Sequence, residues 1–187
     1  MIRRAIKEDA KAIAALMVAA MEDLAKAFVG STDIDDALKL FEYFCGETQN
    51  QYSFENTLVY TIDHEIAGSI TVYDGALLEG LRRPFFDYIQ AHYHTSNFEM
   101  ELESGPGELY IDTLSVNPNY QGKGIGQQLI LAAITWAKEL GHQKVGLLVD
   151  KDNPNAKRLY ERLGFVKAND RLLLGKPHEH LTYSLID

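Results

Sequence analysis

The chain has 187 residues and a net charge of −9 at pH 7, because 27 acidic residues outnumber 18 basic ones. Hydrophobic residues make up 46% and charged residues 24%, which are the proportions of a globular domain and exclude global disorder. The negative charge repels the phosphate backbone of a nucleic acid, so we expect no nucleic-acid partner.

Several features of the sequence predict a cytoplasmic protein. Cys45 is the lone cysteine and can form neither an internal disulfide nor a zinc site from thiols, which favours a reducing compartment. The first nine residues turn acidic and lack the apolar run of a secretory signal. No window approaches the roughly 20 apolar residues that a membrane span needs. We therefore expect one domain over residues 1–187 and no membrane association.

In chain order, a short leading strand is followed by two predicted helices. Apolar residues recur at spacings of three and four over residues 7–28, as on one face of an amphipathic helix. A second helix is predicted over residues 35–45, where Gly46 offers a stop. These two helices are expected to form an amino-terminal cap.

Two antiparallel strands are predicted next, because residues 58–62 and 68–73 are β-branched and aromatic runs joined by the polar segment 63–65. Residues 74–107 predict a helical insertion followed by an acidic, turn-rich segment that we expect to be a mobile loop. In the helical part, one face can be shared by Phe85, Tyr88, Ile89 and His92.

The last part of the chain alternates strands with helices. The expected strands are 108–116, 145–149, 165–167 and 181–186, and the expected helices are 124–140 and 154–163, each followed by a glycine. The order of elements predicts a mixed α/β (α+β) fold built around one sheet.

The segment before the helix at 124–140 is rich in glycine, with Gly122, Gly124 and Gly126 in alternation. Glycines at a helix start let backbone N–H groups approach an anion closely, and the helix dipole adds positive potential at the same point. The segment therefore predicts a phosphate cradle. It fits neither the G-x-G-x-x-G dinucleotide fingerprint nor the P-loop.

Two blocks of this sequence resemble the GNAT superfamily of acyl-CoA-dependent N-acetyltransferases. The first signature of that family is Gln or Arg, two free residues, Gly, one free residue, then Gly or Ala, and it matches Gln121, Gly124 and Gly126. The second is matched by Asn153, Ala156, Tyr160, Gly164 and Phe165. The blocks occur in the family's order, and the resemblance covers residues 108–165.

The resemblance implies a mostly antiparallel central sheet, flanked by helices and splayed near Val116 at the acetyl-CoA site. It implies acetyl-CoA as the acyl donor and no metal. Backbone groups of the strand ending at Val116 would pair with the pantetheine arm as an added strand, and the glycine loop would hold the pyrophosphate, with Lys123 adding a charge. The implied donor-binding residues are Leu114, Ser115, Val116, Gln121, Gly122, Lys123, Gly124, Ile125, Gly126, Gln127, Asn153 and Tyr160.

The resemblance also positions Tyr160 to give a proton to the departing thiolate. The acceptor amine, with a pKa of about 10, must lose a proton, and Glu108 and Asp112 are candidate bases. Both lie on one predicted strand at even spacing with Leu114 and Val116, so we expect all four to share a face. Some family members carry a base glutamate at the position of Glu108. The simpler alternatives are a core tyrosine and structural strand carboxylates.

Two further patterns receive simpler interpretations. The pairs His92 with His94 and His178 with His180 have no third ligand at a recognisable spacing, so we do not expect a metal site. A run of acidic residues can attract a cationic amine, although a solvated acidic loop is the simpler interpretation. This run comprises Glu99, Glu101, Glu103 and Glu108.

We therefore expect this chain to transfer an acetyl group from acetyl-CoA to a primary amine of a small molecule or of a protein. Two alternatives stay open, a non-catalytic module that senses acyl-CoA and an N-acyltransferase that uses a longer acyl chain. The acceptor pocket would be built from the cap helices and residues 74–107. A homodimer is expected at the level of the family.

Overall fold

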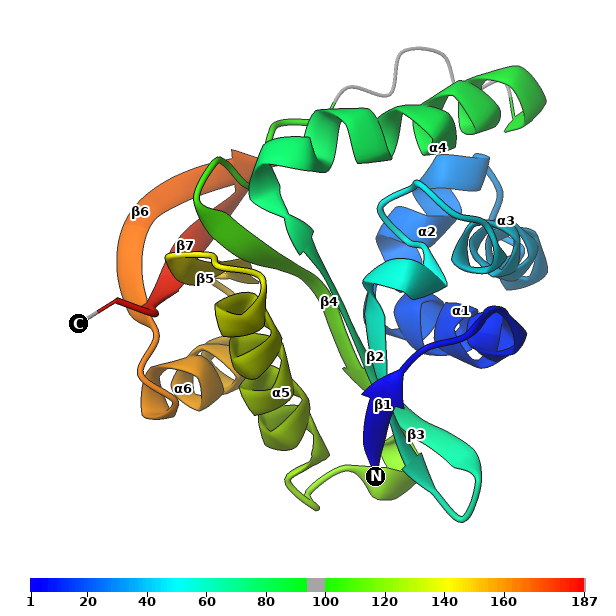
Figure 1. The fold of residues 1–187 in the computed structure, drawn as a ribbon. Helices are drawn as coiled ribbons and strands as arrows, with labels where there is room; N and C mark the ends of the chain where they lie inside the picture. The colour runs from blue at the N-terminus through cyan, green and yellow to red at the C-terminus, as the bar shows by residue number, and fades with distance from the viewer. Residues whose placement is uncertain (94–99, 187) are drawn as a thin grey trace.

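The computed structural model describes residues 1–93 and 100–186. Within them, seven strands form one sheet in the order β1-β2-β3-β4-β5-β7-β6, with helices on both faces (Figure 1). The strands are β1 (Ile2–Arg4), β2 (Thr57–Ile62), β3 (Glu65–Asp74), β4 (Glu108–Val116), β5 (Lys144–Asp150), β6 (Val166–Leu173) and β7 (Lys176–Ser184). The helices are α1 (Ala10–Ala20), α2 (Glu22–Val29), α3 (Ile34–Gly46), α4 (Leu78–Tyr93), α5 (Ile125–Glu139) and α6 (Pro154–Arg162). The predicted mixed α/β class is confirmed.

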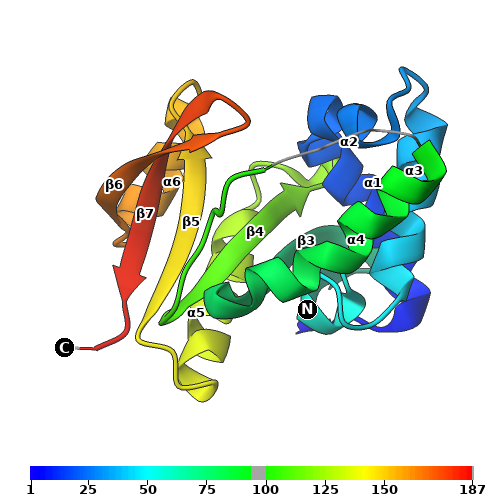
Figure 2. The ribbon, with the colours of Figure 1, turned by 90° about the horizontal axis from the view of Figure 1, so that it is seen from above.

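All neighbouring strands are antiparallel except β4 and β5, which run parallel. The register of that parallel pair ends at Ile111 opposite Leu147. Beyond this point β4 and β5 diverge, as Figure 2 shows from above. The part of β4 from residue 112 to 116 therefore has no strand partner on its β5 side, which confirms the predicted splay.

A β-bulge interrupts β4 at Asp112. The register with β3 passes from Thr113 opposite Thr71 to Ile111 opposite Val72, so Asp112 has no partner residue. An inserted residue reverses the alternation of side chains beyond it. Leu109 and Ile111 before the bulge, and Leu114 and Val116 after it, all pack into the core under α5. The expectation that Glu108 and Asp112 share a face with Leu114 and Val116 is therefore wrong.

The two faces of the sheet carry separate apolar cores. α1 packs on β3 and β4 from one side, with α2, α3 and α4 around it, and this cap core contains Ile13, Met17, Phe28 and Phe41. α5 covers the opposite face, and α6 packs on β5. β4 and β5 separate between these two cores (Figure 1).

The single helix predicted over 7–28 is two helices, because the backbone leaves the helical region at Met21 with φ −137° and ψ 42°. The apolar pattern continues across the break, since Ala25 and Phe28 of α2 reach the same core as α1. The second predicted cap helix is confirmed as α3, and the predicted antiparallel pair as β2 and β3. Asp63 and His64 turn between these strands with φ of 48° and 69°, as a two-residue hairpin turn requires.

The insertion contains the expected helix, α4, with Phe85 and Ile89 buried in the cap core. Of the expected mobile loop over residues 96–107, the part up to residue 99 lies outside the described residues.

The closing strands are longer than the sequence predicts. β6 and β7 form a hairpin that turns at residues 174–175. β6 is the edge strand and is largely exposed on both faces, so it has no apolar alternation for a sequence pattern to detect. No helix among the described residues is long and apolar enough to cross a membrane.

Candidate active site

A groove of about 770 Å³ runs between the end of β4, the glycine loop and α6. It is lined by Leu114, Val116, Tyr120, Gln121, Gly122, Gly124, Ile125, Gly126, Gln127, Asn153, Asn155, Ala156, Leu159 and Arg162. Most of the residues predicted to bind the donor therefore come together in one place. Ser115 and Lys123 do not line this groove, and neither does Tyr160.

The glycine loop presents unpaired backbone N–H groups to this groove. Gly122 and Gly124 have φ of 77° and 76°, a conformation that favours glycine, and Gly124 is the N-cap of α5 without a side-chain cap. The N–H groups of residues 122–127 donate no hydrogen bond within the described part of the chain. Unpaired donors at a helix N-terminus form an anion site, because the helix dipole places positive potential there.

Two side chains shape the loop. The Gln121 side-chain amide donates to the Val116 carbonyl at 3.2 Å, which ties the loop to the end of β4. The Lys123 Nζ atom lies 4.9 Å from the ring centroid of Tyr120 and adds a positive charge beside the groove.

The α6 side of the groove begins at Asn153. Its side-chain oxygen accepts a hydrogen bond from the Ala156 N–H at 3.1 Å, so Asn153 caps α6. Tyr160 is half-buried, with its ring centroid 5.8 Å from that of Phe165. Burial raises the pKa of the Tyr160 hydroxyl to about 12, and no described residue accepts its proton in a hydrogen bond.

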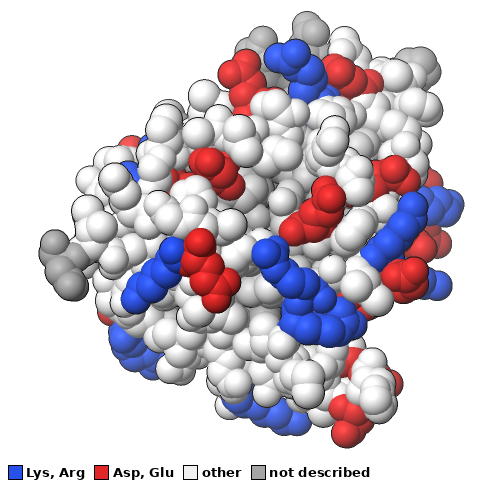
Figure 3. All heavy atoms as spheres, in the orientation of Figure 1, with Lys and Arg blue, Asp and Glu red and all other residues white. Residues whose placement is uncertain are grey.

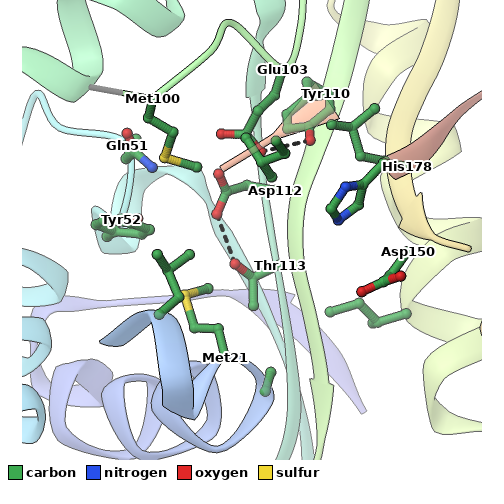
Figure 4. A pocket seen from close by; sticks show the side chains of 15 residues that line it. Met21, Gln51, Tyr52, Met100, Glu103, Tyr110, Asp112, Thr113, Asp150 and His178 are labelled. Atoms are coloured by element: carbon green, nitrogen blue, oxygen red, sulfur yellow. Dashed lines mark hydrogen bonds between the residues drawn. The ribbon is translucent and has the colours of Figure 1, made fainter. Parts of the chain in front are cut away.

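A second space, of about 240 Å³, opens at the splay on the cap side of the sheet (Figure 4). Leu114 lines both this cavity and the groove. The cavity is lined by Ala20, Met21, Leu24, Gln51, Tyr52, Met100, Glu103, Tyr110, Asp112, Thr113, Leu114, Leu148, Asp150, Leu173 and His178. It continues into a mouth of about 810 Å³ between α2 and the tip of the β6–β7 hairpin.

Asp112 faces the cavity together with Tyr110, two residues before it on the same side of β4. Its two oxygens accept hydrogen bonds from the Tyr73 hydroxyl at 2.8 Å and from the Thr113 hydroxyl at 2.7 Å. Removal from water raises the pKa of this carboxyl, and the two hydroxyl donors oppose that rise.

Glu103 lies on the wall of the same cavity and is buried, with 6% of its surface exposed. It is paired with Arg82 of α4 and accepts a hydrogen bond from the Tyr110 hydroxyl at 3.0 Å. Burial and the charge of Asp112 raise the pKa of Glu103 to about 7. The interpretation of this stretch as a solvated acidic loop is therefore wrong for Glu103, although Glu101 is exposed.

One sequence signal could have revealed Glu103. Arg82 lies three residues before Phe85 and seven before Ile89, which puts it on the apolar face of its helix. An arginine on a buried face needs an acidic partner nearby. The segment after the helix supplies that partner.

Glu108 is buried at the start of β4, away from the cavity. One carboxylate oxygen lies 3.0 Å from the His180 Nε2 atom, and the other accepts a hydrogen bond from the Gly105 N–H at 3.0 Å. A side chain at Gly146 would overlap this carboxylate. Its contacts are those of a structural residue, and the base role predicted for Glu108 receives no support from them.

Of the histidine pairs, His178 lines the cavity, His180 binds Glu108, and His94 lies outside the described residues. In the ranges 1–93 and 100–186, no three His, Cys, Asp or Glu side chains are grouped so that they could hold a metal ion. On the face shown in Figure 3, Lys and Arg lie among Asp and Glu, so this face carries no extended basic surface.

A family model described as "Acetyltransferase (GNAT) family" matches residues 18–165. A solved structure described as an acetyltransferase is 28% identical, with a TM-score of 0.85 over 100% of both chains. An N-acetyltransferase from Staphylococcus aureus Mu50 is 26% identical, with a TM-score of 0.85 over 98% of this chain and 100% of that one.

Among curated proteins, the mycothiol acetyltransferase of Thermobispora bispora is 28% identical over 148 residues. That match covers 72% of this chain and 48% of the relative, so the chain spans about half the length of the curated relative it matches.

Proposed function

Because the chain belongs to the acetyltransferase (GNAT) family, we propose that it transfers an acetyl group from acetyl-CoA to a primary amine in a ternary complex. One observation carries the donor half of this proposal. The N–H groups of residues 122–127 have no acceptor in the described part of the chain, and all of these residues except Lys123 line a groove that meets the acidic cavity at Leu114.

The groove fits the donor in charge and in shape. Unpaired N–H groups and Lys123 would bind the pyrophosphate, and the part of β4 without a partner on its β5 side would pair with the pantetheine arm. An arm that follows β4 would bring its thioester to the splay, where Asp112 faces the cavity.

Two kinds of side chain would carry out the proton transfers. Asp112 is a carboxylate facing the cavity and would bind the ammonium group of the acceptor, which would lose a proton to a carboxylate of this cavity. The nitrogen lone pair would then form the C–N bond to the acetyl carbon as the C–S bond breaks, and the thiolate would take a proton from Tyr160. The new amide nitrogen would release its surplus proton, and the Tyr160 oxygen would regain a proton in exchange. With a pKa of about 12, the Tyr160 hydroxyl keeps its proton at neutral pH and is ready to donate it.

The experiment is a calorimetric titration of acetyl-CoA into the wild-type protein, followed by an assay of thiol release with a panel of primary amines. Micromolar binding and amine-dependent thiol release would support the proposal. Binding without thiol release would point to an acyl-CoA sensor, and tighter binding of a longer acyl-CoA would point to another acyl donor. Absence of donor binding would refute the proposal.

A further inference from the structure

Two buried polar groups on the cavity wall have no hydrogen-bond partner in the described chain. Tyr52 and Gln51 are each 2% exposed, and both line the cavity. The Gln51 side-chain oxygen accepts from Arg82 at 3.3 Å, while its amide nitrogen and the Tyr52 hydroxyl have no hydrogen-bond partner among the described residues. Both side chains line the cavity, so these two groups are available to a polar ligand there.

The carboxylates on the same cavity can accept more hydrogen bonds than they do. Each oxygen of Asp112 and of Glu103 accepts from one donor, while a carboxylate oxygen offers about two lone-pair sites. Figure 4 shows Glu103 and Asp112 turned toward the same space, with Tyr52 on the opposite wall. Burial raises the pKa of the Tyr52 hydroxyl, the charges of both carboxylates add to this rise, and Arg82 opposes it.

We propose, resting on the function proposed above, that Glu103, Asp112 and Tyr52 form a three-acceptor site for a primary ammonium group and that Glu103 is the base that takes its proton. An R–NH₃⁺ group has three N–H donors, and the cavity offers one oxygen acceptor from each of these side chains. The Tyr52 hydroxyl accepts with its oxygen and donates its own proton to a carboxylate. A secondary ammonium group would leave one acceptor unpaired and put a methyl group in a cavity of about 240 Å³.

The rest of the cavity selects the body of the acceptor. The cavity and its mouth share the apolar side chains of Ala20, Met21, Leu24 and Leu173 on one hand, and the polar side chains of Asp150 and His178 on the other. An apolar body would leave water by packing against the four apolar side chains. The acceptor class is therefore a primary amine on an alkyl or arylalkyl chain.

The surroundings of Glu103 suit proton transfer near neutral pH. It is faced by Arg82 of α4, Asp112 and Tyr110 of β4, and Tyr52, and the same cavity contains His178 of β7. Burial and Asp112 raise the pKa of Glu103 to about 7, against the opposing effect of Arg82. For an amine with a pKa of about 10, the equilibrium constant for proton transfer to Glu103 is then unfavourable by a factor of about 10³. Transfer to a carboxyl with an unperturbed pKa is unfavourable by more than about 10⁵.

The test uses the full chain and two variants, Tyr52→Phe and Glu103→Gln. Thiol release from acetyl-CoA is measured with phenethylamine and with N-methylphenethylamine, and binding of each amine alone is followed by thermal shift. Controls are Tyr43→Phe and Glu42→Gln, the same changes at exposed positions of α3. Tyr52→Phe removes a hydroxyl that has no hydrogen-bond partner among the described residues, so we expect this variant to fold. Glu103→Gln leaves Arg82 buried without its carboxylate, and Tyr52→Phe keeps the inference testable if that variant does not fold.

We expect kcat/KM for phenethylamine to fall about tenfold in Tyr52→Phe and at least 100-fold in Glu103→Gln, with acetyl-CoA affinity unchanged. Glu103→Gln should also abolish the loss of activity below pH 7. Equal turnover of the two amines, or unchanged turnover in Tyr52→Phe, overturns the inference and leaves the proposed function intact. If acetyl-CoA does not bind, the proposed function fails, and the thermal shift alone tests the ammonium site. A shift in Tm with phenethylamine that is lost in Tyr52→Phe would support the ammonium site. Absence of a shift in the wild type would overturn it.

Discussion

Gly126→Ala separates the stability of the fold from binding of the donor. Gly126 lies in the first turn of α5 with ordinary helical dihedrals, and a Cβ built on it would lie 3.7 Å from Val116 Cγ2 and 3.8 Å from Leu114 Cδ2. These are normal contact distances, so the protein itself tolerates alanine here. The same methyl group would enter the groove that these three residues line.

The expected magnitudes follow from this geometry. Alanine in place of a helical glycine gains up to about 1 kcal/mol, which for 187 residues raises Tm by about 2.5 °C. The methyl group displaces the anion from at least one N–H donor, and a hydrogen bond to a charged group contributes about 1.5–3 kcal/mol. The Kd for acetyl-CoA should therefore rise by about 10- to 150-fold.

The assay pairs thermal unfolding without ligand with calorimetric titration of acetyl-CoA. Gly80→Ala is the control, because Gly80 lies in the first turns of α4 and a Cβ there meets nothing within 4 Å. Both variants should melt at or above the wild-type temperature, and only Gly126→Ala should lose affinity. Unchanged affinity in Gly126→Ala would refute the assignment of this groove as the donor site.

Three further predictions concern catalysis and stability. Tyr160→Phe should lower kcat by about 100-fold without changing the Kd for acetyl-CoA, since it removes only the proton for the thiolate. An unchanged kcat in stopped-flow or steady-state assays would mean that Tyr160 is only a core residue. In the wild type, log kcat/KM should fall with a slope of one below about pH 7, because Glu103 must be ionised to accept a proton and its pKa is about 7; a midpoint near 4.5 would contradict this role. Gly146→Ala should lower the free energy of unfolding by about 1–3 kcal/mol in urea titrations, since the new Cβ overlaps the Glu108 carboxylate. An unchanged midpoint of urea unfolding would mean that this carboxylate can move away without cost.

The sequence by itself determined the parts of the protein whose conformation depends on neighbouring residues in the chain. Gly122 and Gly124 adopt positive φ in their own chain segment, and the apolar spacing of α3 and α5 reflects the period of each helix. The donor groove therefore follows closely from residues 114–127 and 153–162, which lie within about 50 residues of each other in the chain.

The acceptor cavity was decided by tertiary structure. The bulge at Asp112 exists only in the pairing of β4 with β3, and no pattern within β4 shows that its alternation reverses there. Glu103 acquires its raised pKa from Asp112 and from burial, while Arg82, 21 residues earlier, holds it in place. Tyr52 comes from yet another segment and reaches the same space through the packing of the cap. Contacts between distant segments depend on the assembled fold, so only the structure brings these three side chains together.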